Sequence, residues 1–91
     1  MIKVITKSGF ETEIPQNALN DMEVVDALAV NASGDDLERM KALSVICKKL
    51  FGKDRERIYD HVRTEEGRVP PELIEQEILD VFDALGEAGK N

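Results

Sequence analysis

Apolar and polar residues follow two different periods along this chain. In 2–6 and 10–14, β-branched and other apolar residues alternate with polar ones, the period of two that is typical of a strand. Beyond residue 20, apolar residues recur at every third or fourth position, which is the period of a helix. The helices are expected over about 21–32, 36–51, 55–64 and 71–85. The pattern predicts a mostly α member of the α+β class, with an N-terminal β-hairpin followed by about four helices.

The hairpin register follows from its loop. Lys7-Ser8-Gly9 is interpreted as a three-residue loop with Gly9 in the left-handed region. This register pairs Lys3 with Glu13, and it places one apolar face on Ile2, Val4, Phe10 and Ile14. A two-residue loop would mix apolar and charged residues on both faces. We therefore expect a hairpin over 2–14, with Ile5 left on its charged face.

Capping residues and apolar stripes define the predicted helices further. Asn20 or Asp21, Asp35 and Asp54 are expected to cap the first three helices, and Pro70-Pro71 to open the fourth. The predicted inward residues are Met22, Val25, Leu28 and Ala29, then Leu37, Met40, Leu43, Cys47, Leu50 and Phe51, then Ile58, Tyr59 and Val62, and finally Ile74, Ile78, Val81, Phe82 and Leu85. The carboxylates Glu72, Glu75, Asp80 and Asp83 are expected mainly on the solvent side of the fourth helix. We expect a single domain over 1–86 and a flexible C-terminal tail over 87–91.

The net charge of the chain argues against some classes of binding partner. The 91 residues carry 19 acidic and 12 basic side chains, a formal net charge of −7. A surplus of acid argues against a dedicated nucleic-acid binder, because binding phosphates needs a surplus of Lys and Arg. No apolar run approaches the roughly 20 residues that cross a bilayer. We therefore expect neither nucleic acid nor membrane as a partner, and we interpret the mildly basic segment 48–68 as a solvated face.

Few residues suggest catalysis or metal binding. His61 is the one histidine, and Cys47 is the one cysteine, placed on an inward stripe where a thiol behaves as a small apolar side chain. The segment 31–42 has oxygen ligands spaced as in a calcium loop, but Ala42 stands where a bidentate carboxylate is needed and Asp36 where glycine is needed. We expect no enzyme, no cofactor and no metal site.

The hairpin edges suggest self-association. A two-stranded hairpin leaves both outer edges unpaired, which invites another strand. The residues concerned are Lys3, Ile5, Glu11 and Glu13, and the expected partner is a second copy of the chain in a homo-oligomer. An alternative is that the charged members of this set simply protect the edges from pairing.

Several segments together resemble a known family. These are Lys7–Ile14, Asn20–Leu28, Leu50–Gly52, Tyr59–Pro70, Val81–Leu85 and a Gly-Lys-Asn end. In their order and in total length, they resemble the small tail assembly chaperones encoded by long-tailed, siphovirus-type bacteriophages and prophages of Gram-positive bacteria. The resemblance covers nearly the whole chain.

The resemblance implies a non-enzymatic role in the cytoplasm of the bacterial host. Such chaperones keep the tape measure protein soluble and help to recruit tail tube protein around it, and they are absent from the finished virion. For the client-binding surface we predict Tyr59, Val62 and Arg63, because Tyr and Arg are favoured at interfaces and this part of the chain is the least acidic.

Two other functions stay open. One is an adaptor or connector protein that is retained in the virion. The other is a small phage regulatory, DNA-associated protein whose contacts would be Lys48, Lys49, Lys53, Arg55 and Arg57. Asp54, Glu56 and Asp60 interrupt that basic surface.

Overall fold

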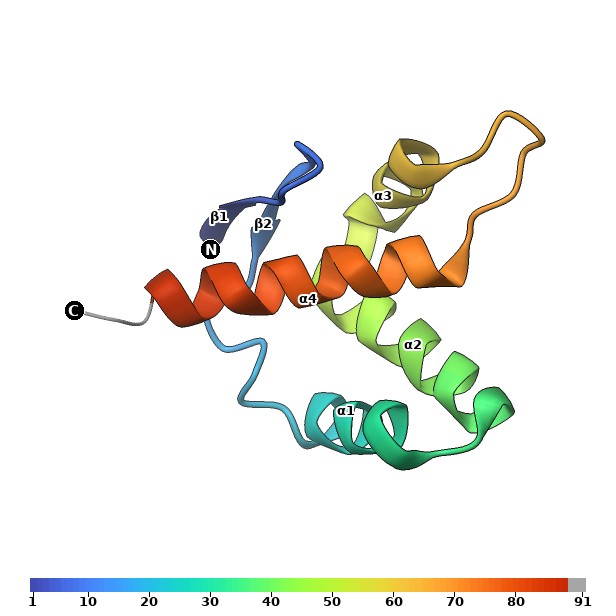
Figure 1. Cartoon of the computed structure of the whole chain (residues 1–91). Coiled ribbons are helices and arrows are strands. Elements are labelled where there is room, and N and C mark those ends of the chain that lie inside the picture. The colour runs from blue at the N-terminus through green and yellow to red at the C-terminus, as the bar shows by residue number, and fades with distance from the viewer. Residues whose placement is uncertain (89–91) are drawn as a thin grey trace.

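A computed structural model describes residues 1–88 (Figure 1). The elements are β1 (Ile2–Ile5), β2 (Glu11–Ile14), α1 (Met22–Ser33), α2 (Asp36–Phe51), a 3-10 turn η1 (Gly52–Asp54), α3 (Arg55–Val62) and α4 (Pro71–Ala88). The α+β, mostly α class with an N-terminal hairpin is confirmed. No helix within residues 1–88 is long and apolar enough to span a membrane. The last three residues of the predicted tail over 87–91 lie outside the described residues.

The hairpin has the predicted register. Ile2 lies opposite Ile14, and Lys3 lies opposite Glu13. The Gly9 N–H donates to the Thr6 carbonyl at 2.9 Å, and Gly9 has a φ of +93°, a conformation that a residue without a Cβ adopts at little cost. The loop is therefore the three-residue type expected from the alternating pattern.

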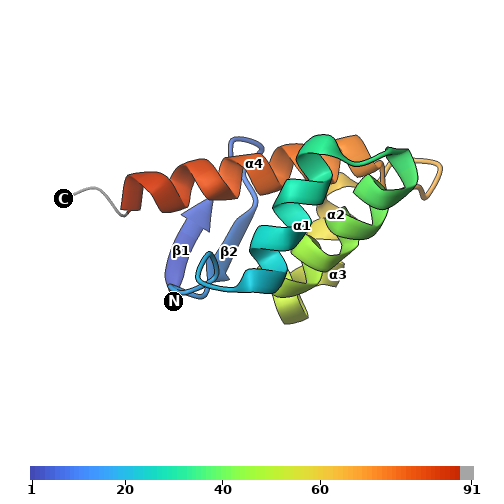
Figure 2. The same cartoon turned by 90° about the horizontal axis from the view of Figure 1, so that it is seen from below.

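Helix α2 is the centre of the molecule. It contacts α1, α3, α4 and β2, while β1 packs against α4 (Figures 1 and 2). The apolar face of the hairpin lies on the helices, as its predicted side chains Val4, Phe10 and Ile14 are buried. Together with residues of α2, α3 and α4 they form one core cluster. Phe10 and Phe51 meet edge to face in it, with ring centroids 6.2 Å apart.

The predicted inward face is wrong for most of α1 and for the start of α2, whereas Leu28 is half-buried and packs against the core as predicted. Val24 and Ala27 are the buried residues of α1, whereas Met22 and Val25 are exposed. Apolar residues surround most of α1, so periodicity alone does not identify the side that meets α2. In α2, the predicted Leu37 and Met40 are exposed, because the first turns of this helix extend past the shared core.

Capping is as predicted for two helices and different for the third. The Asp21 side chain accepts from the Glu23 N–H, and the Asp35 side chain accepts from the Glu38 N–H, each at 2.9 Å. Asp54 makes no such bond, which corrects its predicted role. The chain continues from η1 into α3 without the extended residue that a capping side chain requires.

Two helix ends also differ from expectation. Helix α3 ends at Val62 rather than near 64, because Arg63 adopts an extended backbone. Helix α4 continues through Gly86 to Ala88 rather than ending near 85. Asp80 is buried rather than solvated, because the hairpin loop covers this side of α4.

Candidate functional site

A cluster of polar side chains joins the hairpin loop to α4. At its centre is Glu77, whose side chain is buried, with the residue only 3% exposed. The Thr6 hydroxyl donates to Glu77 Oε1 at 2.8 Å, and the Ser8 Oγ lies 2.9 Å from both carboxylate oxygens. The Phe10 N–H in turn donates to Thr6 Oγ1 at 3.2 Å. The hydroxyls of Thr6 and Ser8 thus both contact the one buried carboxyl group, which satisfies its hydrogen-bonding oxygens.

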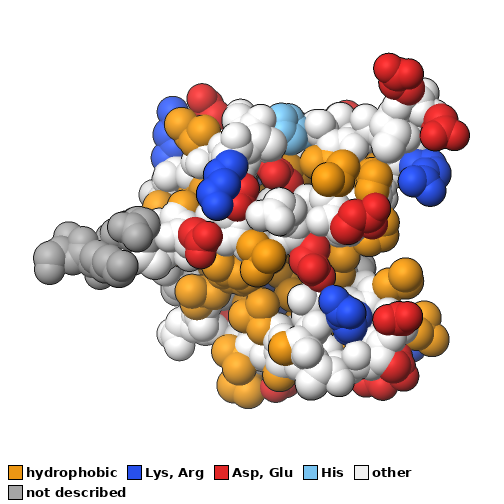
Figure 3. Space-filling model, in the orientation of Figure 1, with side chains coloured by type: hydrophobic (Ala, Val, Ile, Leu, Met, Phe, Trp, Pro, Cys, Tyr) orange, Lys and Arg blue, Asp and Glu red, His pale blue; other side chains and the backbone are white. Residues whose placement is uncertain are grey.

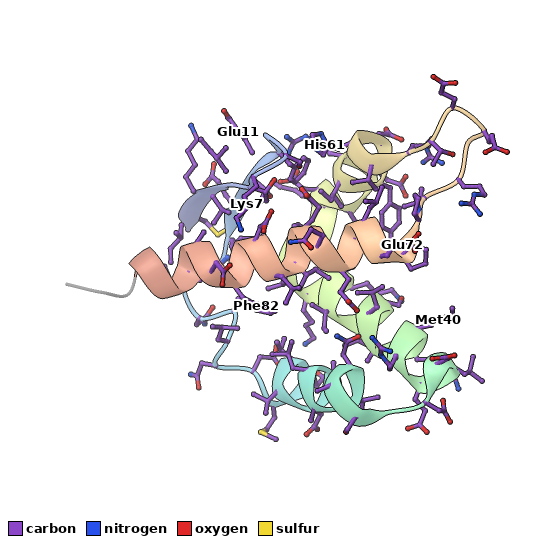
Figure 4. The ribbon with its side chains drawn as sticks, in the orientation of Figure 1. Lys7, Glu11, Met40, His61, Glu72 and Phe82 are labelled. Carbon is purple, nitrogen blue, oxygen red and sulfur yellow. The ribbon has the colours of Figure 1, made fainter. Side chains whose placement is uncertain are left out.

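The cluster extends to α3 through His61. Its Nε2 lies 2.8 Å from the Ser8 Oγ, and Figure 4 shows His61 beside the hairpin. In a catalytic triad, the histidine stands between the serine and the carboxylate. Here the hydroxyl of Ser8 stands between the imidazole and Glu77, so the carboxylate competes with the histidine for the hydroxyl proton. This order differs from that of a triad, and the contacts attach the loop to α3 and α4.

Asp80 provides a second attachment, one turn further along α4. The Lys7 N–H donates to Asp80 Oδ2 at 3.2 Å, and Lys7 Nζ lies 4.0 Å from Oδ1 (Figure 4). The sequence analysis missed Glu77, although its position carried a signal. Residue 77 lies three positions after Ile74 and four before Val81, so it falls on the apolar stripe of α4. A carboxylate in that position indicates a buried partner.

Cys47 is buried and free, as its place on the stripe predicted. Burial raises the pKa of its thiol to about 11, which keeps the sulfur protonated at neutral pH. The imidazole of His61 is engaged with Ser8 and lies against the Phe10 ring, with centroids 5.3 Å apart. The two side chains thus have separate environments.

The client-binding residues predicted on α3 lie together, and their contacts within the chain are extensive. Tyr59 and Val62 are half-buried and pack against the core. Burial raises the pKa of the Tyr59 hydroxyl. Arg63 donates to the Gly67 carbonyl at 3.0 Å and forms an ion pair with Asp60 at 3.1 Å. The guanidinium therefore holds the α3–α4 connection, and its role toward a client stays a prediction.

Two of the five basic residues of the DNA-associated alternative are engaged within the chain. Lys49 Nζ lies 3.1 Å from a carboxylate oxygen of Asp21 and of Glu23. Arg57 pairs with Asp54 at 3.2 Å, and its guanidinium lies 5.0 Å from the centroid of the Phe10 ring. These contacts neutralise part of the basic segment.

The hairpin edges differ from each other. Arg57 Nη2 donates to the Glu11 carbonyl at 2.9 Å, so the β2 edge already has a partner there. Lys3 Nζ lies 3.8 Å from Glu11 Oε2 across the exposed face of the hairpin. Alternation of the ladder turns the backbone groups of Lys3 and Ile5 away from β2, and the Ile5 side chain is exposed. Of the predicted self-association residues, those of β1 lie on the more open edge.

Several exposed apolar residues of the helices lie where a core face was expected, among them Met22, Val25, Leu37 and Met40. Met22, Val25 and Ala29 share one side of α1, which we name the α1 open face. Met22 is 65% exposed and Val25 is 44% exposed. Hydrophobic side chains also gather between α4 and α1 (Figure 3), where Phe82 points from α4 toward α1 (Figure 4). The α1 open face therefore exposes apolar side chains on the side of α1 that does not pack against the core.

Comparison of this chain with known protein families, with curated proteins and with solved structures gives no match.

Proposed function

We propose that this chain is a non-enzymatic tail assembly chaperone that binds the tape measure protein in the cytoplasm of the bacterial host and assists assembly of the tail tube. The observation that carries the proposal is the α1 open face. It leaves Met22 and Val25 largely in water on a helix that packs against α2 on its other side. Contiguous exposed apolar side chains on a small protein mark surfaces that bind other proteins.

The geometry suits a helical client. A helix pair accepts a further helix when its exposed side presents residues three and seven positions apart, as Met22, Val25 and Ala29 do. The net charge of −7 keeps a chain with such a surface dispersed. Weak contacts repeated along a long client gain avidity without any single contact being tight.

The test is co-expression of the chain with a tape measure protein of a long-tailed phage. We expect Val25→Asp to lower the yield of soluble tape measure protein that co-purifies by about tenfold, because a carboxylate on the α1 open face interrupts apolar contact. The control is Leu73→Asp, since Leu73 is 45% exposed, nearly the same as Val25, and lies on the first turn of α4. Equal yields from the two variants would contradict the proposed surface.

The same assay tests the prediction for α3. Tyr59→Ala combined with Arg63→Ala should weaken co-purification if α3 contributes to the client surface. Since Arg63 also holds the Gly67 carbonyl, the free energy of unfolding of this variant is measured first. Unchanged co-purification would remove Tyr59, Val62 and Arg63 from the client surface.

Self-association through the hairpin is proposed as a separate property. Ile5→Lys should convert a homo-oligomer to monomer in light scattering at high micromolar concentration, because Ile5 lies on the open β1 edge. A wild-type chain that is strictly monomeric at that concentration would contradict it. Mass spectrometry of purified virions separates the chaperone from an adaptor or connector, which alone persists in the particle.

A further inference from the structure

Helices α1 and α2 enclose a groove of about 390 Å³ on one side of their contact. Its floor is apolar and consists of Ala27 and Val30 from α1 and Ala42 and Val45 from α2. The small side chains of Ala27 and Ala42 create the hollow. Only α1 and α2 line the groove in the described part of the chain, and Figure 2 shows these helices side by side in front of α4. We name this feature the α1–α2 groove.

The rim of the groove is acidic. Glu23 and Asp26 border it on α1, and Glu38 and Lys41 border it on α2. Glu23 is paired with Lys49 at 3.1 Å. Within residues 1–88, no cation lies at ion-pair distance from Asp26 or Glu38. An apolar floor is therefore bordered by two carboxylates that lack a positive partner.

The opposite side of α2 is already covered by α4. There Arg39 donates to the Asn31 carbonyl at 3.1 Å and pairs with Glu75 of α4 at 3.7 Å, which ties α1, α2 and α4 together. The groove is the side on which a third helix would complete the α1–α2 pair. Its lining spans eight residues on each helix, 23–30 and 38–45, so the groove is about 12 Å long and matches about two helical turns.

We propose that the α1–α2 groove is a docking site for a basic amphipathic helix of a protein partner, with its apolar stripe on the alanine and valine floor and its Lys or Arg side chains against Asp26 and Glu38. Complementary charge selects the partner and sets its orientation more than it adds affinity. This inference goes beyond the proposed client surface, because it concerns a different side of α1 and a partner of defined charge.

The experiment uses two synthetic fluorescein-labelled helices of 15 residues with the same leucine stripe. One carries lysines beside the stripe, and the other carries glutamates. Fluorescence anisotropy at 50 mM NaCl should show the lysine helix binding the wild-type chain at least about tenfold more tightly than the glutamate helix. Amide chemical shifts should change at Ala27, Val30, Ala42 and Val45. Equal affinity for the two helices, or shift changes elsewhere only, would overturn the proposal.

Matched charge reversals locate the binding. Asp26→Lys with Glu38→Lys should weaken binding of the lysine helix by about tenfold, because both rim carboxylates are removed. Glu66→Lys with Asp83→Lys changes the net charge equally at exposed positions outside the groove, and it should weaken binding by about twofold or less. Equal weakening by the two variants would show that the lysine helix is attracted by the overall charge of the chain, and it would overturn the proposed docking site. Because capture of the tape measure protein is scored with Val25→Asp, either proposal can fail while the other holds.

Discussion

Helices α1 and α4 both pack against α2, and they are held there by different means. Helix α4 contacts α2, α3 and β1, and its buried side includes two carboxylates that bind the hairpin loop. Helix α1 has its main contact with α2, through Val24 and Ala27, and it leaves Met22 and Val25 in water. Both helices expose apolar side chains, Leu73 and Leu79 on α4 among them, but the buried carboxylates of the described residues, Glu77 and Asp80, both lie on α4.

The difference separates the interior of the fold from a surface suited to partners. Burying Glu77 is favourable only because the hydroxyls of Thr6 and Ser8 are positioned to donate to it. The buried side of α4 is therefore stable only when the hairpin loop packs on it in this position. The exposed side of α1 needs no other segment of the chain to satisfy its side chains. Substitutions on the buried side of α4 should therefore lower the stability of the fold. Substitutions on the exposed side of α1 should instead weaken the binding of a partner.

The largest expected effect is that of Glu77→Ala. It leaves the hydroxyls of Thr6 and Ser8 without their buried acceptor and opens a cavity, so the free energy of unfolding should fall by about 3 kcal/mol. Urea unfolding followed by circular dichroism measures it. Glu72→Ala is the control, because Glu72 is exposed on the same helix and should cost less than about 0.5 kcal/mol. Similar losses from the two variants would refute the anchoring role of Glu77.

The rate at which a cysteine reacts can be compared between the buried side of α2 and the α1 open face. Burial holds the pKa of Cys47 at about 11, so at pH 8 it should react with a disulfide reagent roughly a hundredfold more slowly than an ordinary thiol. A cysteine introduced by Val25→Cys in a Cys47→Ala background should react at the ordinary rate. Comparable rates for the two sites would contradict the comparison.

The same pKa gives a pH dependence with a defined sign. A thiol whose pKa is higher in the folded state than in the unfolded state contributes stability below its unfolded pKa and loses it as the pH rises. The free energy of unfolding should therefore decline between about pH 9 and pH 11. In Cys47→Ala this part of the decline should be missing, which urea titrations at several pH values would detect.

Gly34→Ala should loosen the joint between α1 and α2. A Cβ at this position would lie 2.7 Å from the Val30 carbonyl oxygen and 3.0 Å from Val30 Cγ1, so the free energy of unfolding should fall by about 1–2 kcal/mol. Gly86→Ala is the control, because its Cβ would meet nothing within 4 Å on α4, and it should stabilise the chain by about 0.5 kcal/mol. Thermal unfolding compares the two, and a Gly34→Ala variant as stable as Gly86→Ala would contradict the close approach.

The smallest effect is expected at the start of α1. Hydrogen bonds from Lys49 and from the Glu23 N–H lower the pKa of Asp21, so its contribution to stability is present above the unfolded pKa and is lost as the pH falls through the folded value. The protection of amides in the first turn of α1 against hydrogen exchange, relative to their intrinsic rates, should fall below about pH 4. Asp21→Ala removes the capping oxygen and should show lower protection there already at neutral pH, while Asp26→Ala should not. Identical exchange in the two variants would exclude a capping role.

Local chemistry accounts for the elements that were predicted correctly. The period of two, together with Gly9, was enough for the hairpin register, because a shift by one residue would expose Val4 and Ile14 to water. Asp21 and Asp35 act on N–H groups two or three residues away, so their caps also follow from sequence. Asp54 does not cap α3 because its carboxylate binds other groups. It accepts from the hydroxyl of Thr12 of β2 at 3.0 Å and pairs with Arg57 of α3.

By itself, the sequence determined where strands and helices form and how the hairpin pairs, since these depend on neighbours within a few positions. The tertiary structure alone decided which side of α1 meets α2 and that the hairpin loop is the partner of Glu77 and Asp80. These features depend on contacts between segments that are distant along the chain. The hairpin loop, for example, lies about 70 residues before the carboxylates of α4 that it contacts. The pattern within one helix can mark a position such as Glu77 as inward, but it does not identify the segment that packs on it.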